Sequence, residues 1–170
     1  MADSLAPFKR EPMFLTLQSH VPAGRGSDPT GFLCFTLGEE EYGVDLKLVA
    51  QVVKPPAVTW VPRLPSHFLG IVSIRGAVVT LVDLRQLMGL DITSWPRTSR
   101  ILIVEIGDEQ IGLLVDSVTQ VRRVKPEQLE KKPYLREGVT TDHVICIARP
   151  DEKKPVLIVD LDSILQEKLK

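Results

Sequence analysis

From Phe32 onward, the apolar residues of the chain fall into short runs that are rich in Val, Ile and Leu and are separated by Gly, Pro or acidic pairs. Runs of this length, with little 3.6-residue periodicity, are typical of buried β-strands. Residues 1–30 differ, because they carry four prolines and only one short apolar run, Met13–Leu15. The pattern predicts a mobile tail over 1–30 that precedes an all-β fold with short helices.

An internal repeat with a shift of 69 residues organises these strands. Segment 32–44 aligns with segment 101–113, and each copy has an apolar run, a Gly-acidic pair and a second apolar run. Gly38-Glu39 and Gly107-Asp108 fit two-residue hairpin loops, because glycine accepts the positive φ that the first loop position requires. The repeat therefore predicts two equivalent β-hairpins.

Each half ends with an apolar run that leads into Asp-Leu and then into a short helical stretch. Between the halves, residues 91–100 are polar and contain a proline, which predicts a linker. The ranges 31–90 and 101–170 are then two small β subdomains, the second with a C-terminal helix. Units of this size gain stability by packing together, so we expect a single folding unit.

Asp83 and Asp160 are the carboxylates on which an enzymatic hypothesis can rest, since each follows a buried strand. Both also precede residues with the pattern of a helix N-terminus, and Gln86 is placed to form a capping box with Asp83. The capping interpretation is favoured, and catalysis is the third hypothesis. The three histidines are far apart in the sequence and none has a second ligand at metal-binding spacing, so no metal site is predicted.

The charge and motif content exclude several other classes of protein. The net charge is −1, and the basic stretch 122–125 lacks the aromatic neighbours that nucleic-acid binding uses, so a solvated strand face is predicted there. No nucleotide-binding or hydrolase motif is present, and no apolar run approaches the length of about 20 residues that spans a membrane. Cys34 and Cys146 lie in apolar runs and are predicted to be core residues of a protein in the reducing cytoplasm.

Arg75 lies in segment 70–79, which is otherwise almost wholly apolar. Burial of an unpaired guanidinium is costly, so Arg75-Gly76 is predicted to form a bend that keeps the side chain in water. Two interpretations are open. The bend is either purely structural, or it projects Arg75 towards a partner, as arginines commonly do at interface hot spots.

Taken together, the ordered motifs resemble the CheW family of chemotaxis coupling proteins. The segments that carry this resemblance are 37–45, 62–65, 70–76, 82–85 and 112–118. The resemblance extends from Gly31 to Leu165. It implies two five-stranded SH3-like β-barrels packed as one CheW-like domain, in agreement with the repeat.

The resemblance also implies a non-enzymatic adapter that holds a CheA-type histidine kinase against the cytoplasmic tip of a methyl-accepting chemoreceptor. No cofactor, nucleic acid or membrane insertion belongs to that function. The positions that match the family's receptor-binding groove and its supporting residues are Val49, Gln51, Val52, Gly70, Arg75, Val118 and Val121. The repeat relates the valines of the first half to those of the second, so equivalent elements of both barrels would line one apolar groove.

Three positions depart from the family pattern. Gln51 stands where the family usually has Glu beside the Arg75 position, so a charge-assisted pair becomes a neutral hydrogen bond. Ser73 replaces Asn, and Thr80 replaces Pro. These departures do not threaten the fold, but they leave open whether the receptor belongs to a dedicated motility or developmental pathway. A second hypothesis is a regulatory domain that occupies the kinase's docking surface without coupling it to a receptor.

Overall fold

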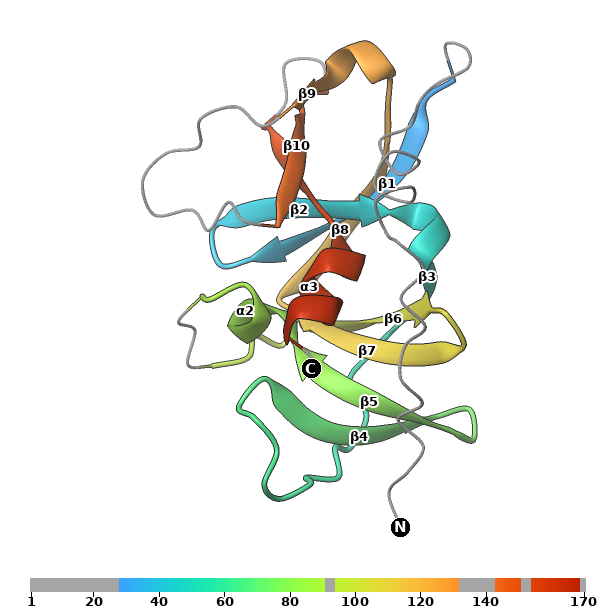
Figure 1. Cartoon of the computed structure of the whole chain (residues 1–170), viewed down its shortest axis with the longest axis vertical. Helices are drawn as coiled ribbons and strands as arrows, with labels where there is room; N and C mark the ends of the chain where they lie inside the picture. The colour runs from blue at the N-terminus through green and yellow to red at the C-terminus, as the bar shows by residue number, and fades with distance from the viewer. Residues whose placement is uncertain (1–27, 91–93, 132–142, 151–153, 169–170) are drawn as a thin grey trace.

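The computed structural model describes residues 28–90, 94–131, 143–150 and 154–168 (Figure 1). Residues 1–27 of the expected tail and 91–93 of the expected linker therefore lie outside the described residues. The strands are β1 (Thr30–Leu37), β2 (Glu40–Asp45), β3 (Val49–Val53), β4 (Phe68–Ile74), β5 (Ala77–Asp83), β6 (Arg100–Ile106), β7 (Glu109–Val115), β8 (Ser117–Val124), β9 (Leu129–Lys131), β10 (Val144–Ala148) and β11 (Val156–Val159). The helical elements are η1 (Leu46–Leu48), α2 (Leu84–Leu87), η2 (Pro126–Gln128) and α3 (Leu161–Lys168).

The strands form two sheets, which Figure 1 shows one above the other. The upper sheet has six strands in the order β8-β1-β2-β11-β10-β9, and the lower sheet has five in the order β3-β6-β7-β5-β4. Neighbouring strands are antiparallel except at β2–β11 and β5–β7, where they are parallel. The predicted all-β fold with short helices is confirmed. The upper sheet has one strand more than expected, because β9 adds to the edge of β10.

Each sheet combines strands from both halves of the sequence. The hairpin β1–β2 of the first half pairs with β8 and β11 of the second, and the hairpin β6–β7 of the second half pairs with β3 and β5 of the first. The sheets therefore do not follow the expected division into 31–90 and 101–170, since each half places its opening hairpin in the sheet of the other. The repeat is compatible with either arrangement, because both bring equivalent strands side by side.

Both predicted hairpin loops are confirmed. Leu37 pairs with Glu40 across the first loop, and Ile106 pairs with Glu109 across the second. The glycines at the first loop positions have φ of 62° and 60°, in the left-handed region that glycine adopts without steric cost.

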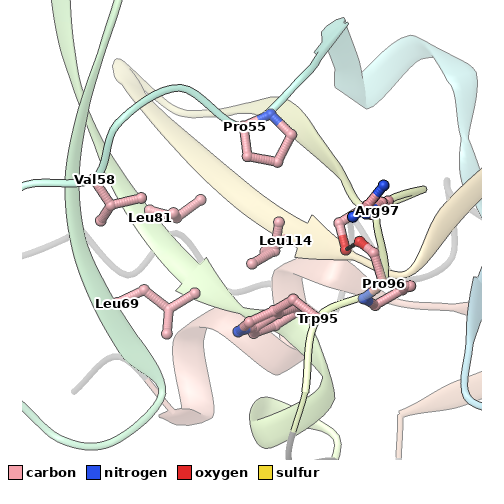
Figure 2. A pocket seen from close by; sticks show the side chains of 9 residues that line it. Pro55, Val58, Leu69, Leu81, Trp95, Pro96, Arg97 and Leu114 are labelled. Carbon is pink, nitrogen blue, oxygen red and sulfur yellow. Dashed lines mark hydrogen bonds between the residues drawn. The ribbon is translucent and has the colours of Figure 1, made fainter.

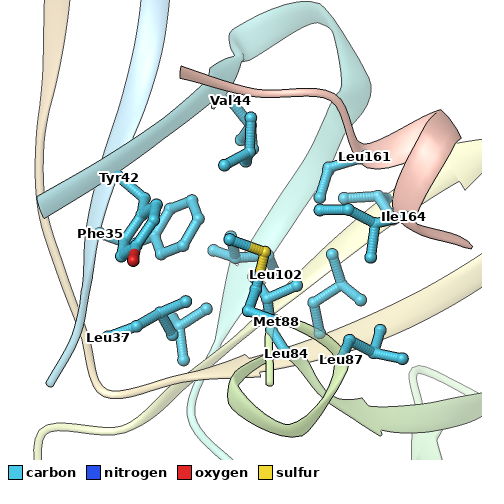
Figure 3. Packing of buried hydrophobic residues seen from close by; sticks show 14 of the residues in the cluster. Phe35, Leu37, Tyr42, Val44, Leu84, Leu87, Met88, Leu102, Leu161 and Ile164 are labelled. Carbon is cyan, nitrogen blue, oxygen red and sulfur yellow. The ribbon is translucent and has the colours of Figure 1, made fainter. Parts of the chain in front are cut away.

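Strand alternation divides the apolar side chains into three core layers. In β1, Leu33 and Phe35 face the central core between the two sheets, whereas Phe32 and Cys34 belong to a second cluster on the opposite face. The strand β6 alternates in the same way between the central core and a third cluster in the lower sheet. Figure 3 shows side chains of β1, α2 and α3 meeting in the central core. Because both faces of these strands are buried, their sequences are nearly continuous apolar runs.

Candidate functional site: two edge strands and the turn at Arg75

The strands β3 and β8 are equivalent edge strands, since β3 pairs only with β6 and β8 only with β1. Each strand has a bulge at the equivalent position, where Ala50 and Thr119 are the extra residues. A bulge inserts one residue and so changes which side chains face each side of a sheet. The conserved spacing of the repeat thus includes the bulges as well as the side chains on either side of them.

The four valines predicted for the groove lie on the faces of β3 and β8 that are turned towards the central core. Val49 and Val118 are partly buried and pack against that core. Val52 and Val121 each lie opposite a member of the central core in the strand register, yet 40% and 48% of their surfaces are exposed. Residues directly opposite each other on antiparallel strands share a face of the sheet. The two edge strands therefore present matched valines, partly buried before the bulge and exposed after it.

Gln51 lies apart from these valines, because its partner in the register, Ile103, belongs to the lower cluster rather than to the central core. The strands β3 and β4 are also at opposite ends of the strand order. Within the part of the chain that the structure describes, no hydrogen bond joins Gln51 to Arg75. The neutral hydrogen bond expected at this pair is therefore not formed in the structure.

The predicted bend at Arg75-Gly76 is confirmed as the two-residue turn between β4 and β5, where Ile74 pairs with Ala77. The φ angles of Arg75 and Gly76 are 50° and 83°, and two successive positive values are the pattern of a type I′ turn. Glycine, Asn and Asp adopt this backbone readily, whereas a long side chain is strained by it. Arg75 is exposed, so the strained backbone holds a guanidinium in solvent at the end of a hairpin.

Gly70 is buried in β4 and has a φ of 138°. A Cβ at this position would clash with the backbone oxygen of Thr59, which accepts a hydrogen bond from Ile71 N at 2.9 Å. Glycine is therefore required where the 54–67 connection closes over the outer edge of β4. The structure gives Gly70 this local role, and its expected place in the groove stays a prediction.

The caps predicted at Asp83 and Asp160 are confirmed. Asp83 Oδ1 accepts hydrogen bonds from Arg85 N at 2.9 Å and Gln86 N at 3.4 Å, and Asp160 Oδ1 accepts from Ser163 N at 3.2 Å. The capping box is not formed, because Gln86 Nε2 donates to the Asp83 carboxylate and the Asp83 N–H donates to a carbonyl outside the helix. Burial raises the pKa of Asp83, although the Arg85 guanidinium and the amide hydrogen bonds oppose the shift.

Arg85 forms a buried polar network that the sequence analysis did not predict. The side chain is 1% exposed, and Nη1 lies 3.2 Å from Asp116 Oδ1 and donates to Ser94 O at 2.8 Å. Asp116 Oδ2 in turn accepts from Gly38 N at 2.7 Å, in the hairpin loop of the upper sheet. The network thus joins α2, which follows a strand of the lower sheet, to the upper sheet. A basic residue inside the apolar run 81–90 is the sequence signal that could have indicated it.

The described part of the expected linker packs against the fold. The Arg85 guanidinium lies 3.5 Å from the centre of the Trp95 ring, a cation–π contact. Figure 2 shows Trp95 and Pro96 on one side of a cavity of about 490 Å³ and leucines of β4, β5 and β7 on another. The lining residues are Pro55, Val58, Leu69, Leu81, Trp95, Pro96, Arg97, Ser99 and Leu114.

The basic stretch 122–125 is only partly a solvated face. Arg122 Nη2 lies 3.2 Å from Glu41 Oε2, with both side chains largely buried, whereas Arg123 is exposed. The same carboxylate group accepts a hydrogen bond from Thr119 Oγ1 at 2.7 Å. Arg122 therefore ties the edge strand β8 across β1 to β2.

Both cysteines are core residues, as predicted. Cys34 and Cys146 are buried and not paired with each other, and burial raises the pKa of each thiol to about 11. Among the residues that the structure describes, no three His, Cys, Asp or Glu side chains gather where they could hold a metal ion. Within the same residues, no helix has the length and apolar character needed to cross a membrane.

With this geometry in place, comparison with known families is decisive. The family model of the CheW-like domain matches residues 31–169. The chain belongs to the CheW family. The match includes both sheets, both edge strands and the turn at Arg75, so the CheW-like domain is built from strands of both halves.

Individual CheW relatives agree with this assignment. The chain is 28% identical over 134 residues to the chemotaxis protein CheW of Klebsiella aerogenes, covering 79% of this chain and 80% of the relative. It is 32% identical over 130 residues to CheW of Helicobacter pylori, covering 71% and 79%. The crystal structure of the scaffolding protein TtCheW from Thermoanaerobacter tengcongensis matches with a TM-score of 0.74 and 32% identity, covering 84% of this chain and 96% of that one.

Proposed function

We propose that this chain is a non-enzymatic scaffold that couples a CheA-type histidine kinase to the cytoplasmic tip of a methyl-accepting chemoreceptor. It does so in the cytoplasm, so that the state of the receptor governs phosphorylation by the kinase. Membership of a family whose relatives are chemotaxis and scaffolding proteins supports this function. In the proposal, the receptor tip is recognised by side chains of β3, β8 and the turn at Arg75.

The matched exposure of Val52 and Val121 is the observation that carries the proposal. The chain repeats the strand, the bulge and the valine in both halves, and the valine after the bulge is left exposed in each. Apolar side chains of this kind form the grooves in which partner proteins bind an amphipathic helix. Val49 and Val118 anchor the two strands to the central core, so the exposed valines stand on a rigid support.

The strained turn at Arg75 supports the recognition interpretation over the purely structural one. A bend alone is made at lower conformational cost by Asn-Gly, because Asn tolerates positive φ better than Arg. The chain instead holds an exposed guanidinium there. In the proposal, Arg75 contacts polar or acidic groups beside the receptor helix.

Two other hypotheses are less well supported. Catalysis rested on Asp83 and Asp160, and both carboxylates cap helices. A regulatory domain that binds the kinase but no receptor would not need an exposed valine on each of two equivalent strands. Reconstitution separates that hypothesis from ours, because only a coupling protein changes kinase output when receptor is added.

The test compares Val52→Asp with Val121→Asp and measures the affinity of each variant for the kinase and for the receptor tip. Burial of one valine contributes about 1.5 kcal/mol, and a carboxylate would be desolvated without a partner, so each variant should lose receptor affinity by at least about tenfold. Kinase affinity should be unchanged. Leu64→Asp is the matched control, because Leu64 is 43% exposed on the connection before β4.

Circular dichroism and urea unfolding establish first that each variant is folded. Retention of receptor affinity in both folded valine variants would exclude the groove. Simultaneous loss of kinase and receptor binding together with unfolding would show instead that the valines are core residues. Equal receptor losses at two positions 69 residues apart in the sequence would support a groove formed by both sheets.

A further inference from the structure

Three exposed apolar side chains border the place where the chain enters the upper sheet. Leu46, Val52 and Val121 are exposed by 40%, 40% and 48%. The side chain of Leu46 lies beside Gly31, where an added Cβ would be 3.5 Å from Leu46 Cδ2. Gly31 is the second residue of β1, and η1, which contains Leu46, lies against both β1 and β6. We call these three side chains the apolar patch.

The 27 residues before the described fold are attached next to this patch. Thr30 pairs with Val124, and Leu33, three residues further along β1, pairs with Val121. The first residue of β1 is thus about 10 Å along the strand from the patch valine of β8. Residues 18–27 span up to about 35 Å when extended, which is more than enough for the preceding residues to reach the patch.

The tail carries one segment with the chemistry to cover such a patch. Residues 13–17 read Met-Phe-Leu-Thr-Leu, and no other stretch before Asp28 has as many large apolar side chains together. The connection 18–27 contains two glycines and two serines. Tethers of this type give an effective concentration of about 1 mM, so a contact that is weak between separate molecules becomes populated within one chain.

We infer that residues 13–17 bind reversibly across the apolar patch and compete with the receptor helix for Val52 and Val121. The inference rests on the proposed function, because it assigns a regulation to the same groove. The tail is favoured over other apolar segments because it alone is attached beside Leu46. A tether at about 1 mM and an intrinsic dissociation constant of about 0.1–1 mM would reduce the apparent receptor affinity by about 2- to 10-fold.

The first measurement follows the methyl NMR signals of Val52 and Val121 and uses no receptor. Deletion of residues 1–27 should shift both signals, and a peptide of residues 11–20 added to the shortened chain should move them back. Phe14→Asp with Leu17→Asp in the full chain should reproduce the deletion. The matched control is Leu5→Asp with Val21→Asp, which adds the same charges outside the apolar segment and should leave the signals unchanged.

The second measurement is the affinity for the cytoplasmic tip fragment of a methyl-accepting chemoreceptor. The deletion and the Phe14–Leu17 double variant should both bind about 2- to 10-fold more tightly than the full chain, and the control double variant should not. Identical valine signals and identical affinities with and without the tail would overturn the inference while leaving the proposed function intact. Signals that depend on protein concentration, and not on the tail, would also overturn it, because a second copy would then cover the patch.

Absence of receptor binding in every form would contradict the proposed function. The valine signals then decide the tail contact independently, since they are measured on the chain alone. The competition is supported only when the valine signals and the receptor affinity change together.

Discussion

The two sheets share one strand plan, but only the helix that follows the lower sheet links the two sheets through buried charges. At the end of β5, Asp83 is 1% exposed and is followed by Arg85, which reaches Asp116 and, through it, the upper sheet. At the equivalent end of β11, Asp160 is partly exposed and the residue in the place of Arg85 is Asp162. The comparison shows that the repeat specifies strands, loops and bulges, whereas the side chains that couple the sheets belong to one half only.

The largest effect expected from this difference is that of Arg85→Ala. Removal of one partner from a buried ion pair leaves an uncompensated charge, so the free energy of unfolding should fall by about 3–5 kcal/mol. The equivalent change Asp162→Ala removes only a carboxylate in the first turn of α3 and should cost less than about 1 kcal/mol. Urea unfolding followed by circular dichroism measures both values. Similar small losses for the two variants would mean that the network does not contribute to the stability of the fold.

The next effect concerns how the outer edges of the sheets are closed. In the lower sheet the chain passes over Gly70, whereas in the upper sheet the strand β9 pairs with β10 at Cys146. Gly70→Ala introduces both a clash with Thr59 and an unfavourable φ, so a loss of at least about 2 kcal/mol is expected. Cys146→Ala is the matched change at the upper edge and should cost less. A Gly70→Ala protein as stable as the parent would contradict the close approach.

A smaller effect of opposite sign is expected at the connections between the paired strands. The lower sheet uses the tight turn Arg75-Gly76, whereas the upper sheet joins β10 to β11 through residues 149–155. Arg75→Asn should relieve the strained backbone and raise the free energy of unfolding by about 0.5–1 kcal/mol. Receptor affinity should fall in the same variant. Lower stability with unchanged receptor affinity would show that Arg75 serves the fold.

The smallest expected difference is the one between the unfolding curves of the two sheets, which should coincide. Both tryptophans belong to the lower part of the molecule, and both cysteines lie in the core cluster of the upper sheet. Tryptophan fluorescence and thiol alkylation in urea at pH 8 therefore report on different sheets. Thiol exposure at lower urea than the fluorescence change would mean that the upper sheet unfolds separately.

The cysteines also give this experiment a pH dependence. Because the pKa of each thiol rises from about 9 in the unfolded chain to about 11 on folding, the neutral thiol is favoured in the folded state. Their contribution to stability is fully present below pH 9 and is lost as the pH rises through about 11. Stability at pH 10.5 should therefore fall less in Cys34→Ala with Cys146→Ala than in the parent, relative to the stability of each protein at pH 8.

The local structure was predictable because it depends on neighbouring residues. The Gly-acidic loops and the caps at Asp83 and Asp160 require particular residue types within three positions, and all of these are visible in the sequence. The exchange of hairpins was not predictable in the same way, since either arrangement buries the same alternating side chains. The contact of Arg85 with Asp116 joins residues 31 positions apart, and no local pattern specifies it.

The position of the exposed valines lies between these cases. Their residue type and their repeat relation were visible in the sequence, together with the resemblance that assigned them to a groove. The bulges at Ala50 and Thr119 decide that Val52 and Val121 face the central core, and a bulge depends on how two strands pair. The sequence therefore indicated which residues to consider, and the pairing showed on which face they lie.

The exchange of hairpins makes this single chain equivalent to a two-fold symmetric dimer whose subunits are fused. A half-length chain of this plan could complete its sheet only by receiving the hairpin of a second copy, and its assembly would depend on concentration. Fusion of the halves makes that exchange intramolecular and removes the dependence on concentration. It also frees the two halves to diverge, so that one can carry Arg85 and the tight turn at Arg75 while the other carries the longer connection and the terminal helix.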